Sequence, residues 1–455
     1  MTFSRQLHKF GGSSLASKEC YRHVVQILKK YSNSEDLIVV SAAGNTTDYL
    51  IKFLKNSFKD KKLSSKTLQV LYQFQTELVK ELLNGKIRMQ LLSRLDNEFS
   101  ILQELTRTLH ESKKAMVLGY GELWSARLLT SLLCQENLQS VLQDSRTLLR
   151  ANSSAQPEID SKSSYPLIKK ALTKYTNQRL IITGFMAKNL HGNTVLLGRN
   201  GSDYSATIIG SLAKVSKVTI WSDVMGIYSA DPRIVDNAYL LPLLRLDEAS
   251  ELARLASPVL HSRTLQPVAK SKKMDLTLRS TKKPESGLTR IERVLEVSYK
   301  AKIITSLEQV LLIHLTFHQN NNFNTIVSNV LKNLKLIQLE PLAFQFKIEQ
   351  QTIYLAYTEE IANEALDYLQ NISTGAEIKL KTDYSLIAAI GAGIIKNTNH
   401  CYKFYQQIKS SPVEFISKSQ LSLVAILYKT PVFPLVIDIH NHLFQTKKKE
   451  IHHCL

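Results

Sequence analysis

Short apolar runs that lead into glycine or polar turns recur through the first half of the chain. They lie at residues 5–10, 36–43, 179–183, 194–197 and 217–223. An apolar run of this length bounded by turn residues predicts a buried strand, whereas apolar positions three to four residues apart predict a helix. Helical segments are expected at residues 18–31, 49–113, 123–133 and 206–214. Alternating strands and helices predict an α/β fold with a mostly parallel sheet.

The turn Gly198-Arg-Asn-Gly-Ser-Asp203 carries the most chemistry in the shortest stretch. It joins an expected strand to an expected helix, so its backbone N–H groups and the positive helix end would face an anion. Arg199 can fork onto a carboxylate, while Ser202 and Asp203 add a hydroxyl and a carboxylate. The alternative interpretation is a polar loop with a surface Arg–Asp pair.

A second glycine turn follows the first expected strand. Lys9 ends that strand, and Gly11, Gly12 and Ser13 precede the next helix. Adjacent glycines let the backbone approach a phosphate without interference from Cβ atoms. The lysine precedes the glycines, so this is not a Walker A loop, and Lys9 would reach the phosphates from the strand end. An ordinary tight turn is the alternative.

Further polar groups follow other strand ends. Thr47 comes after the strand at 36–43, and Glu122 lies in the first turn of the helix near 123–133, where a dipole-stabilising role is the simpler alternative. The strand at 217–223 leads into a loop that offers hydrogen bonds to a sugar, a ring for a base and a cation for phosphate, unless its residues serve only loop architecture. Its candidate residues are Ser222, Asp223, Tyr228, Asp231 and Arg233. A doubly wound sheet would gather all these strand ends at one edge.

Composition narrows the class of protein. The chain has 455 residues with 44% hydrophobic content, enough for two to four globular domains. Its net charge of +19 is spread along the chain without a nucleic-acid-binding motif, so no nucleic-acid partner is expected. Four widely spaced cysteines indicate neither a disulfide framework nor a zinc site and fit a reducing cytoplasm. No signal segment or membrane span is expected, and no membrane partner.

Seven of these motifs, in order, resemble the motif series of aspartokinases in the amino acid kinase superfamily. The resemblance covers about 300 residues and is carried by 9–14, 40–44, 121–122, 198–205, 221–223, 228–233 and 259–261. Residues 5–10, 241–253 and 263–267 are most similar to the kinase half of the methionine-branch bifunctional aspartokinase–homoserine dehydrogenases. This resemblance implies an amino acid kinase fold, an open sheet with helices on both faces, over residues 1–298. It also implies transfer of the ATP γ-phosphoryl group to the β-carboxylate of L-aspartate, the first step of lysine, threonine and methionine biosynthesis.

The resemblance also implies residue roles. Lys9 would neutralise charge on the transferred phosphoryl group and Asp203 would hold Lys9 or the Mg²⁺ shell in place. Glu122 would pair with the substrate ammonium and Arg199 with its α-carboxylate, with Thr47 and Ser202 completing the pocket. The nucleotide would be held by Gly11, Gly12, Ser13, Ser222, Asp223, Tyr228, Asp231 and Arg233. Mg²⁺ would arrive with ATP, and no metal ligands of the protein are assigned.

Two residues depart from the family pattern. Asp48 stands where asparagine is usual, and this places an extra negative charge near a dianionic substrate. Pro258 replaces a lysine thought to contact the nucleotide, as it does in the bifunctional relatives. Weaker aspartate binding is one expected consequence of Asp48.

The pattern after residue 298 differs from that of the first half. Residues 299–445 predict two ferredoxin-like units that resemble the regulatory ACT modules of aspartokinases, with dimerisation or tetramerisation as their expected role. The first unit lacks the usual glycine-bearing effector loop, so little inhibition by lysine or threonine is expected. Residues 446–455 resemble the junction to a homoserine dehydrogenase domain, and no G-x-G-x-x-G motif for that activity occurs in the chain.

Two alternative functions remain at the level of sequence. One is an amino acid kinase for another substrate, such as glutamate. The other is a catalytically silent regulatory or partner-binding remnant, against which the retained Lys9, Glu122, Arg199 and Asp203 count.

Overall fold

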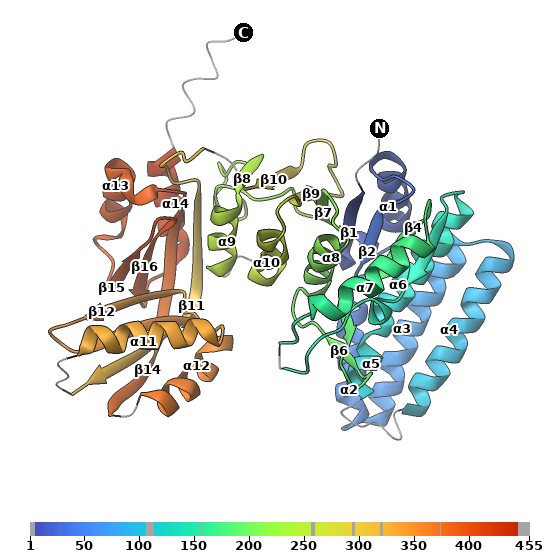
Figure 1. Cartoon of the computed structure of the whole chain (residues 1–455), viewed down its shortest axis with the longest axis horizontal. Helices are drawn as coiled ribbons and strands as arrows, with labels where there is room; N and C mark the ends of the chain where they lie inside the picture. Colours follow the sequence, from blue (N-terminus) through green and yellow to red (C-terminus); the bar gives the residue numbers. More distant parts are fainter. Residues whose placement is uncertain are drawn as a thin grey trace, which may run out of the picture. The chain divides into compact units, whose positions relative to one another are not determined.

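The computed structural model describes residues 5–105, 113–154, 156–255, 260–293, 296–318, 322–373 and 375–444. The chain forms two compact units (Figure 1). The first contains the residues up to 226 together with 263–291, and the second contains 227–262 and the residues from 292 onward. These units group residues by contact, and the domain boundaries expected at residues 298 and 445 stay a prediction.

The first unit alternates strands and helices along most of its length. Its strands are β1 (Gln6–Phe10), β2 (Leu37–Val40), β3 (Ser140–Gln143), β4 (Arg179–Thr183), β5 (Met186–Lys188), β6 (Thr194–Leu196), β7 (Lys217–Ser222), β9 (Asp275–Ser280) and β10 (Leu288–Glu292). Its helices are α1 (Lys18–Tyr31), α2 (Thr46–Ser57), α3 (Lys61–Leu82), α4 (Gly85–Leu105), α5 (Lys114–Leu118), α6 (Tyr120–Gln135), α7 (Ser161–Lys174), α8 (Gly201–Leu212) and α10 (Ser262–Lys270), with a 3-10 turn η1 at Gly12–Leu15. The strands expected from the apolar runs and the helix expected at 18–31 are confirmed.

The main sheet of this unit runs in the order β3-β4-β2-β1-β7-β9-β10. All neighbours are parallel except β10, which pairs antiparallel to β9. The four residues of β2 are all buried, as a central strand covered on both faces requires. The predicted open, mostly parallel sheet is therefore confirmed. β5 and β6 form a separate antiparallel pair.

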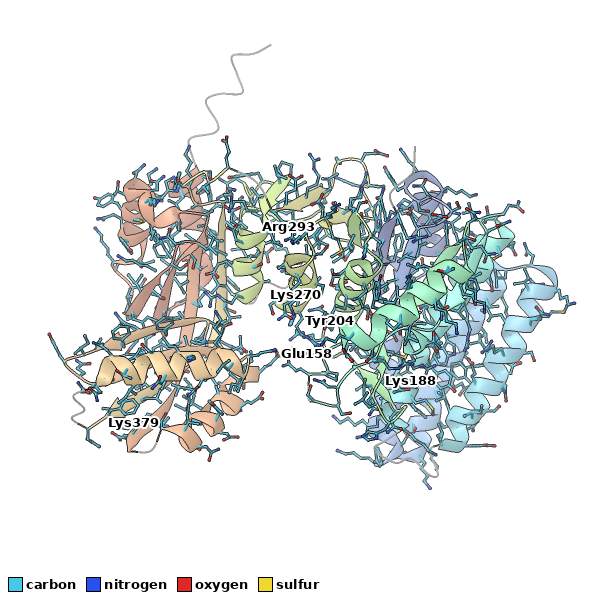
Figure 2. The ribbon with its side chains drawn as sticks, in the orientation of Figure 1. Glu158, Lys188, Tyr204, Lys270, Arg293 and Lys379 are labelled. Carbon is cyan, nitrogen blue, oxygen red and sulfur yellow. The ribbon has the colours of Figure 1, made fainter. Side chains whose placement is uncertain are left out.

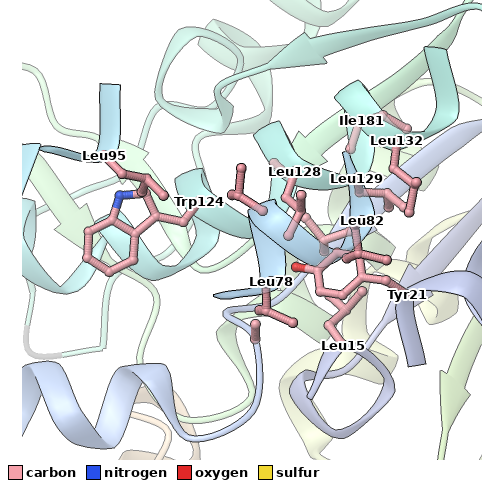
Figure 3. Close-up of a cluster of buried hydrophobic side chains, with 14 of the residues drawn as sticks. Leu15, Tyr21, Leu78, Leu82, Leu95, Trp124, Leu128, Leu129, Leu132 and Ile181 are labelled. Atoms are coloured by element: carbon pink, nitrogen blue, oxygen red, sulfur yellow. The ribbon is translucent and has the colours of Figure 1, made fainter. Parts of the chain in front are cut away.

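Successive side chains of each strand point to opposite faces of this sheet, and helices cover both faces. Phe10 and Val40 belong to a core with α1, α3, α4 and α6, whose side chains Figure 3 shows around Tyr21 and Trp124. Lys9 precedes Phe10 and so points to the other face, where α8 packs against β1, β2 and β7. Neighbouring residues of β1 therefore have different surroundings: Phe10 packs in the core, and Lys9 lies on the face that α8 covers.

The second unit contains a six-stranded antiparallel sheet and its helices. Its elements are β8 (Leu243–Arg245), α9 (Leu246–Arg254), β11 (Ile303–Phe317), α11 (Phe323–Leu336), β12 (Ala343–Lys347), β13 (Thr352–Thr358), α12 (Glu359–Ile372), β14 (Ala376–Ile390), α13 (Thr398–Ile408), β15 (Val413–Lys418), β16 (Ser422–Tyr428) and α14 (Val432–Phe444). The sheet order is β12-β13-β11-β14-β16-β15. The part β12-β13-β11-β14 with α11 and α12 has the β-α-β-β-α-β arrangement of a ferredoxin-like module.

The two expected ferredoxin-like modules share one sheet. β11 and β14 are each 15 residues long and pair along nearly their whole length, from Ile303 with Ile390 to Phe317 with Ala376. One half of this pair serves the first module, and the other half serves the second with β15, β16, α13 and α14. Two separate cores, one with α11 and α12 and one with α13 and α14, preserve the two-module organisation.

Among the described residues, no helix combines the length and the apolar character that crossing a bilayer requires.

Candidate active site

The carboxyl ends of four neighbouring strands of the first unit meet at one edge of the sheet. Register pairs Phe10 of β1 with Val40 of β2 and with Trp221 of β7, so these three strands end at the same level. β4 ends beside β2, where Gly184 N donates to Val40 O at 2.9 Å. An open α/β sheet binds its ligands at this edge. The predicted gathering of the polar strand ends is therefore observed for β1, β2, β4 and β7.

Lys9 and Asp203 form an ion pair at this edge. The Lys9 Nζ atom lies 2.5 Å from Asp203 Oδ1, and the side chains are only 9% and 22% exposed. Asp203 lies in the first turn of α8, where a carboxylate also interacts favourably with the helix dipole. A nearly buried ammonium group held by a single carboxylate can reach toward an anion without leaving its partner.

Contacts of Tyr204, the residue after Asp203, fix the start of α8. Tyr204 O–H accepts a hydrogen bond from Ile159 N at 3.3 Å, and the Arg263 guanidinium stacks over the Tyr204 ring at 4.6 Å (Figure 2 labels Tyr204). Arg263 also donates to Leu197 O. The strand β6, the turn and the helix start are therefore held as one piece.

The two glycines after Lys9 have different surroundings. A Cβ atom on Gly12 would lie 2.8 Å from Ala42 O and 3.1 Å from Gly44 O, so the loops after β1 and β2 touch at that point. Gly44 N donates to Gly12 O at 2.9 Å. A Cβ on Gly11 would instead face Lys9 Nζ at 3.6 Å. Gly12 is thus required for packing, and Gly11 keeps the space beside the ammonium group clear.

Glu122 is a buried carboxyl group with one oxygen to spare. It lies in the first turn of α6 and is 3% exposed. Its Oε1 accepts from Ala42 N at 3.4 Å, whereas Oε2 has no hydrogen-bond partner among the described residues. Burial raises the pKa of Glu122 to about 8, partly offset by backbone hydrogen bonds and by the positive charge of Lys9. A buried acceptor of this kind suits a cationic group supplied by a ligand.

Three other residues of the predicted substrate pocket lie around this edge. Thr47 is half-buried in the first turn of α2. Ser202 is buried and packs closely against Gly184. A Cβ atom added to Gly184 would lie only 2.7 Å from Ser202 Oγ. Arg199 is exposed in the turn before α8. Gly198 and Asn200 on either side of Arg199 both have positive φ, +77° and +54°, so the turn geometry is tight.

The predicted nucleotide residues are divided between the two units. Ser13 and Ser222 both donate their hydroxyl hydrogens to Asp223 Oδ1 at 3.2 Å, and this joins the glycine turn to the end of β7. Tyr228, Asp231 and Arg233 belong to the second unit. There Asp231 forms an ion pair with Arg233 at 2.6 Å. The hydrogen bond from the Arg233 side chain, and to a smaller extent its backbone N–H and its charge, lower the pKa of Asp231.

The loop that contains Tyr228 is held within the second unit by its neighbour Ser229. The Ser229 hydroxyl pairs with the buried His440 ring of α14 at 2.8 Å and accepts from Tyr239 N at 3.0 Å. Ser229 O accepts from Ile304 N at the start of β11. The loop expected to bind nucleotide is therefore attached to the elements of the ferredoxin-like modules.

The departures from the family pattern fall in different places. Asp48 is exposed in the first turn of α2, next to Thr47, where its charge suits the helix dipole. Pro258 lies outside the described residues.

Two buried networks behind the site were not predicted. Gln75 of α3 donates to Thr46 Oγ1 at 3.0 Å, and Thr46 donates to Ala43 O, so α3 supports the turn that carries Thr47. His8, fully buried, accepts from Trp221 Nε1 at 3.2 Å and approaches Asp36 at 3.5 Å. Burial opposes ionisation of Asp36, but hydrogen bonds from His8 and two backbone N–H groups outweigh it and lower its pKa. Only the isolated polar residues within apolar runs could have indicated these networks.

Taken together, the first unit offers a cation for an anionic group, a buried carboxyl for a cationic group and hydroxyls around them. No group of three or more His, Cys, Asp or Glu side chains that could hold a metal ion occurs among the described residues.

Comparison with known proteins identifies the family. The model of the "Amino acid kinase family" matches residues 4–278. The chain belongs to the amino acid kinase family. The predicted family and fold class are thereby confirmed.

Individual amino acid kinases show similarity beyond the matched region. The chain is 46% identical over 448 residues to bifunctional aspartokinase/homoserine dehydrogenase 2 of Escherichia coli K12, covering 98% of this chain and 55% of that protein. It is 27% identical to the aspartokinase of Chlamydia pneumoniae, covering 98% of this chain and 99% of that one. The chain thus spans about half the length of the bifunctional relative.

The fold is that of a solved aspartokinase. The crystal structure of E. coli aspartokinase III in complex with aspartate and ADP superposes with a TM-score of 0.82 at 21% identity, covering 96% of this chain and 99% of that chain. The similarity extends over both compact units, so the second unit shares the fold of that protein as well.

Proposed function

We propose that this amino acid kinase transfers the γ-phosphoryl group of ATP to the β-carboxylate of L-aspartate, giving 4-phospho-L-aspartate and ADP. The observation that carries the proposal is that one sheet edge holds both the Lys9 ammonium group and the buried Glu122 carboxyl, whose second oxygen has no partner among the described residues. An amino acid that attacks ATP through a second carboxylate needs both groups. The Glu122 carboxyl would bind its ammonium group, and Lys9 would bind the phosphate that it attacks. The relatives named aspartokinase agree with this substrate.

The chemistry needs positioning more than acid–base catalysis. A carboxylate is already ionised at neutral pH, so the nucleophile requires no general base. Lys9 would stabilise charge on the transferred phosphoryl group, and the backbone N–H groups of Gly11 and Gly12 would add to it. Asp203 keeps Lys9 in place through the ion pair. Mg²⁺ would enter as MgATP and reduce the negative charge of the phosphates.

The remaining residues are assigned to binding. Arg199 would fork onto the α-carboxylate, Glu122 would accept from the α-ammonium group, and Thr47 and Ser202 would line the pocket. The nucleotide would contact Ser13, Ser222, Asp223, Tyr228, Asp231 and Arg233. The kinase domain would comprise residues 1–298 and the paired ACT-like modules 299–445.

We also propose that the modules form a homo-oligomer. β12 is an edge strand of the second sheet and carries exposed Phe344 and Phe346, with Ile348 just beyond it. An exposed apolar edge strand is a site for pairing with another chain. Sedimentation velocity tests this proposal, and a monomer at all protein concentrations would contradict it.

The experiment that tests the proposed reaction is a hydroxamate assay for the acyl phosphate, with ATP, Mg²⁺ and L-aspartate. We expect product with L-aspartate and little with L-glutamate. Lys9→Ala removes the cation at the transferred phosphate and should lower kcat about 100- to 1,000-fold. Lys29→Ala, in an exposed ion pair on α1, is the matched control and should keep full activity. Product from glutamate alone would indicate a different amino acid kinase, and no product from either would indicate a silent remnant.

A further inference from the structure

The turn between α2 and α3 carries an unusual concentration of positive charge. Residues 51–66 contain six lysines and one acidic residue, Asp60. All six lysines are exposed, and none has an acidic partner at ion-pair distance in the described part of the chain; they are Lys52, Lys55, Lys59, Lys61, Lys62 and Lys66. Asp60 is used as the N-cap of α3, where its side chain accepts from Leu63 N at 3.0 Å.

Two of these lysines lie at the N-terminal end of a helix, where positive charge lowers helix stability. α3 begins with Lys61 and Lys62 and has no acidic residue in its first turn, so two cations face the positive end of the helix dipole. Placing cations there costs stability. The carboxylate at this helix end is the N-cap Asp60, and neither lysine forms an ion pair in the described part of the chain. A local conflict of this kind is expected where a surface serves binding.

Large apolar side chains are exposed between these lysines. Phe58, the residue after α2, is 58% exposed, Ile51 is 48% exposed, and Leu63 and Val70 of α3 are 42% and 41% exposed. Ile51 and Phe58 lie seven residues apart and so share one side of α2, as Leu63 and Val70 share one side of α3. The turn lies at the lower end of α2 and α3 in Figure 1. We call this surface, residues 51–70 with their exposed side chains, the lysine–phenylalanine patch.

We propose that the lysine–phenylalanine patch binds the surface of a membrane that contains anionic lipids. Lysine heads would contact the lipid phosphates, while Phe58, Leu63 and Ile51 would enter the boundary between headgroups and acyl chains. Long lysine side chains suit this position because their stems can lie along apolar surface while their charges stay in water. Such binding lies on the membrane surface and needs no spanning segment. It departs from the expectation of no membrane partner that was drawn from the sequence.

The composition of the patch disfavours two other occupants. Protein interfaces are enriched in tyrosine, tryptophan and arginine and depleted in lysine, whereas the patch has six lysines and no arginine. Surfaces that bind single-stranded nucleic acid combine positive charge with several aromatic rings for stacking, and the patch offers Phe58 as its exposed aromatic residue. Aliphatic side chains between lysines match a lipid boundary instead.

Co-sedimentation of the whole chain with vesicles tests the proposal. We expect binding to vesicles of phosphatidylglycerol and phosphatidylcholine, little binding to phosphatidylcholine alone, and release at high salt. Each lysine near an anionic surface contributes about fivefold in partition. The triple variant Lys55→Gln, Lys59→Gln, Lys62→Gln should therefore bind about 100-fold less. The control Lys162→Gln, Lys169→Gln, Lys170→Gln changes the net charge equally on exposed lysines of α7 and should bind as the unaltered chain does.

A second variant separates lipid binding from simple attraction between charges. Phe58→Ser should lower vesicle binding about tenfold, because it removes an apolar side chain that would leave water. Unchanged phosphoryl transfer in solution and an unchanged circular dichroism spectrum would show that each variant is folded. Absent binding to anionic vesicles, or equal losses in the two triple variants, would overturn the proposal. Tight binding to RNA or polyglutamate that Phe58→Ser leaves unaffected would overturn it as well.

Discussion

At the residue scale, the buried Glu122 carboxyl links the proposed binding of the substrate ammonium group to pH. Burial favours its neutral form and raises its pKa to about 8. A bound ammonium group favours the ionised form, so ligand binding and loss of the proton are linked. Under the proposed role, Glu122 would hold its proton more readily in the free protein and lose it when the substrate ammonium group binds.

We expect the KM for aspartate to fall as the pH rises toward 8, because less free energy is then needed to ionise Glu122. Glu122→Gln should raise the KM and remove this pH dependence. Initial rates at varied aspartate concentration between pH 6 and about 9 would measure both effects. A KM profile that is equally steep in the glutamine variant would assign the dependence to another group.

The same shift predicts a stability effect. The folded pKa of Glu122 lies above its unfolded value, so its contribution to stability is present below the unfolded pKa and is lost as the pH rises through the folded pKa. Glu122→Gln should therefore become more stable relative to the unaltered chain as the pH rises from about 5 to 8. Urea unfolding at several pH values would measure this trend, and a constant difference would contradict it.

Asp48 allows a second test at the residue scale. Its charge lies in the first turn of α2, beside Thr47 of the proposed pocket. Asp48→Asn removes repulsion toward a substrate with two carboxylates, so the KM for aspartate should fall by a few-fold. An unchanged KM would show that Asp48 does not sense the substrate.

At the scale of elements, the glycine turn after β1 separates packing from chemistry. Gly12→Ala would push a methyl group against Ala42 O at 2.8 Å and should destabilise the fold, measured as a lower Tm. Gly11→Ala leaves an ordinary contact distance of 3.6 Å to Lys9 Nζ. It should keep the Tm and lower kcat, because the methyl group occupies the proposed phosphate position. An equal decrease in Tm in both variants would show that Gly11 is also required for packing.

The elements themselves were largely predictable. The apolar runs predicted β1, β2, β4 and β7 because central parallel strands are buried on both faces and read as continuous apolar segments. β6 was predicted from its short apolar run, although it is a half-buried strand in an antiparallel pair with β5. The polar carboxyl ends of the strands were predicted to meet at one edge of the sheet, and those of β1, β2, β4 and β7 do so. The networks around Gln75 and His8 were not predictable, since each joins residues that lie far apart in the sequence. The predicted residue roles stay predictions until the variants are measured.

At the scale of the whole molecule, the second unit holds the loop that contains Tyr228. The loop with Tyr228 is tied to α14 by Ser229 and His440 and to β11 by a backbone hydrogen bond. A change in the modules would therefore reach this loop directly. The modules share β11 and β14, which the separate strand patterns in the sequence did not reveal.

We expect lysine and threonine at millimolar concentration to leave the phosphoryl-transfer rate nearly unchanged, because the first module lacks the glycine-bearing loop that usually receives an effector. The hydroxamate assay with each amino acid added would measure this. Inhibition by half or more with either one would show that the module binds an effector by other residues.

The sequence by itself determined the alternation of strands and helices, the order of the glycine turns and the family, because these follow from local patterns of apolar and turn residues. The tertiary structure alone decided that Asp203 takes Lys9 as its partner out of the two expected possibilities. It also showed that Glu122 has a buried oxygen without a partner among the described residues and that two modules share one pair of long strands. Each of these depends on residues distant in the chain meeting in space, and the resulting burial sets their charges and contacts. No local pattern carries that information.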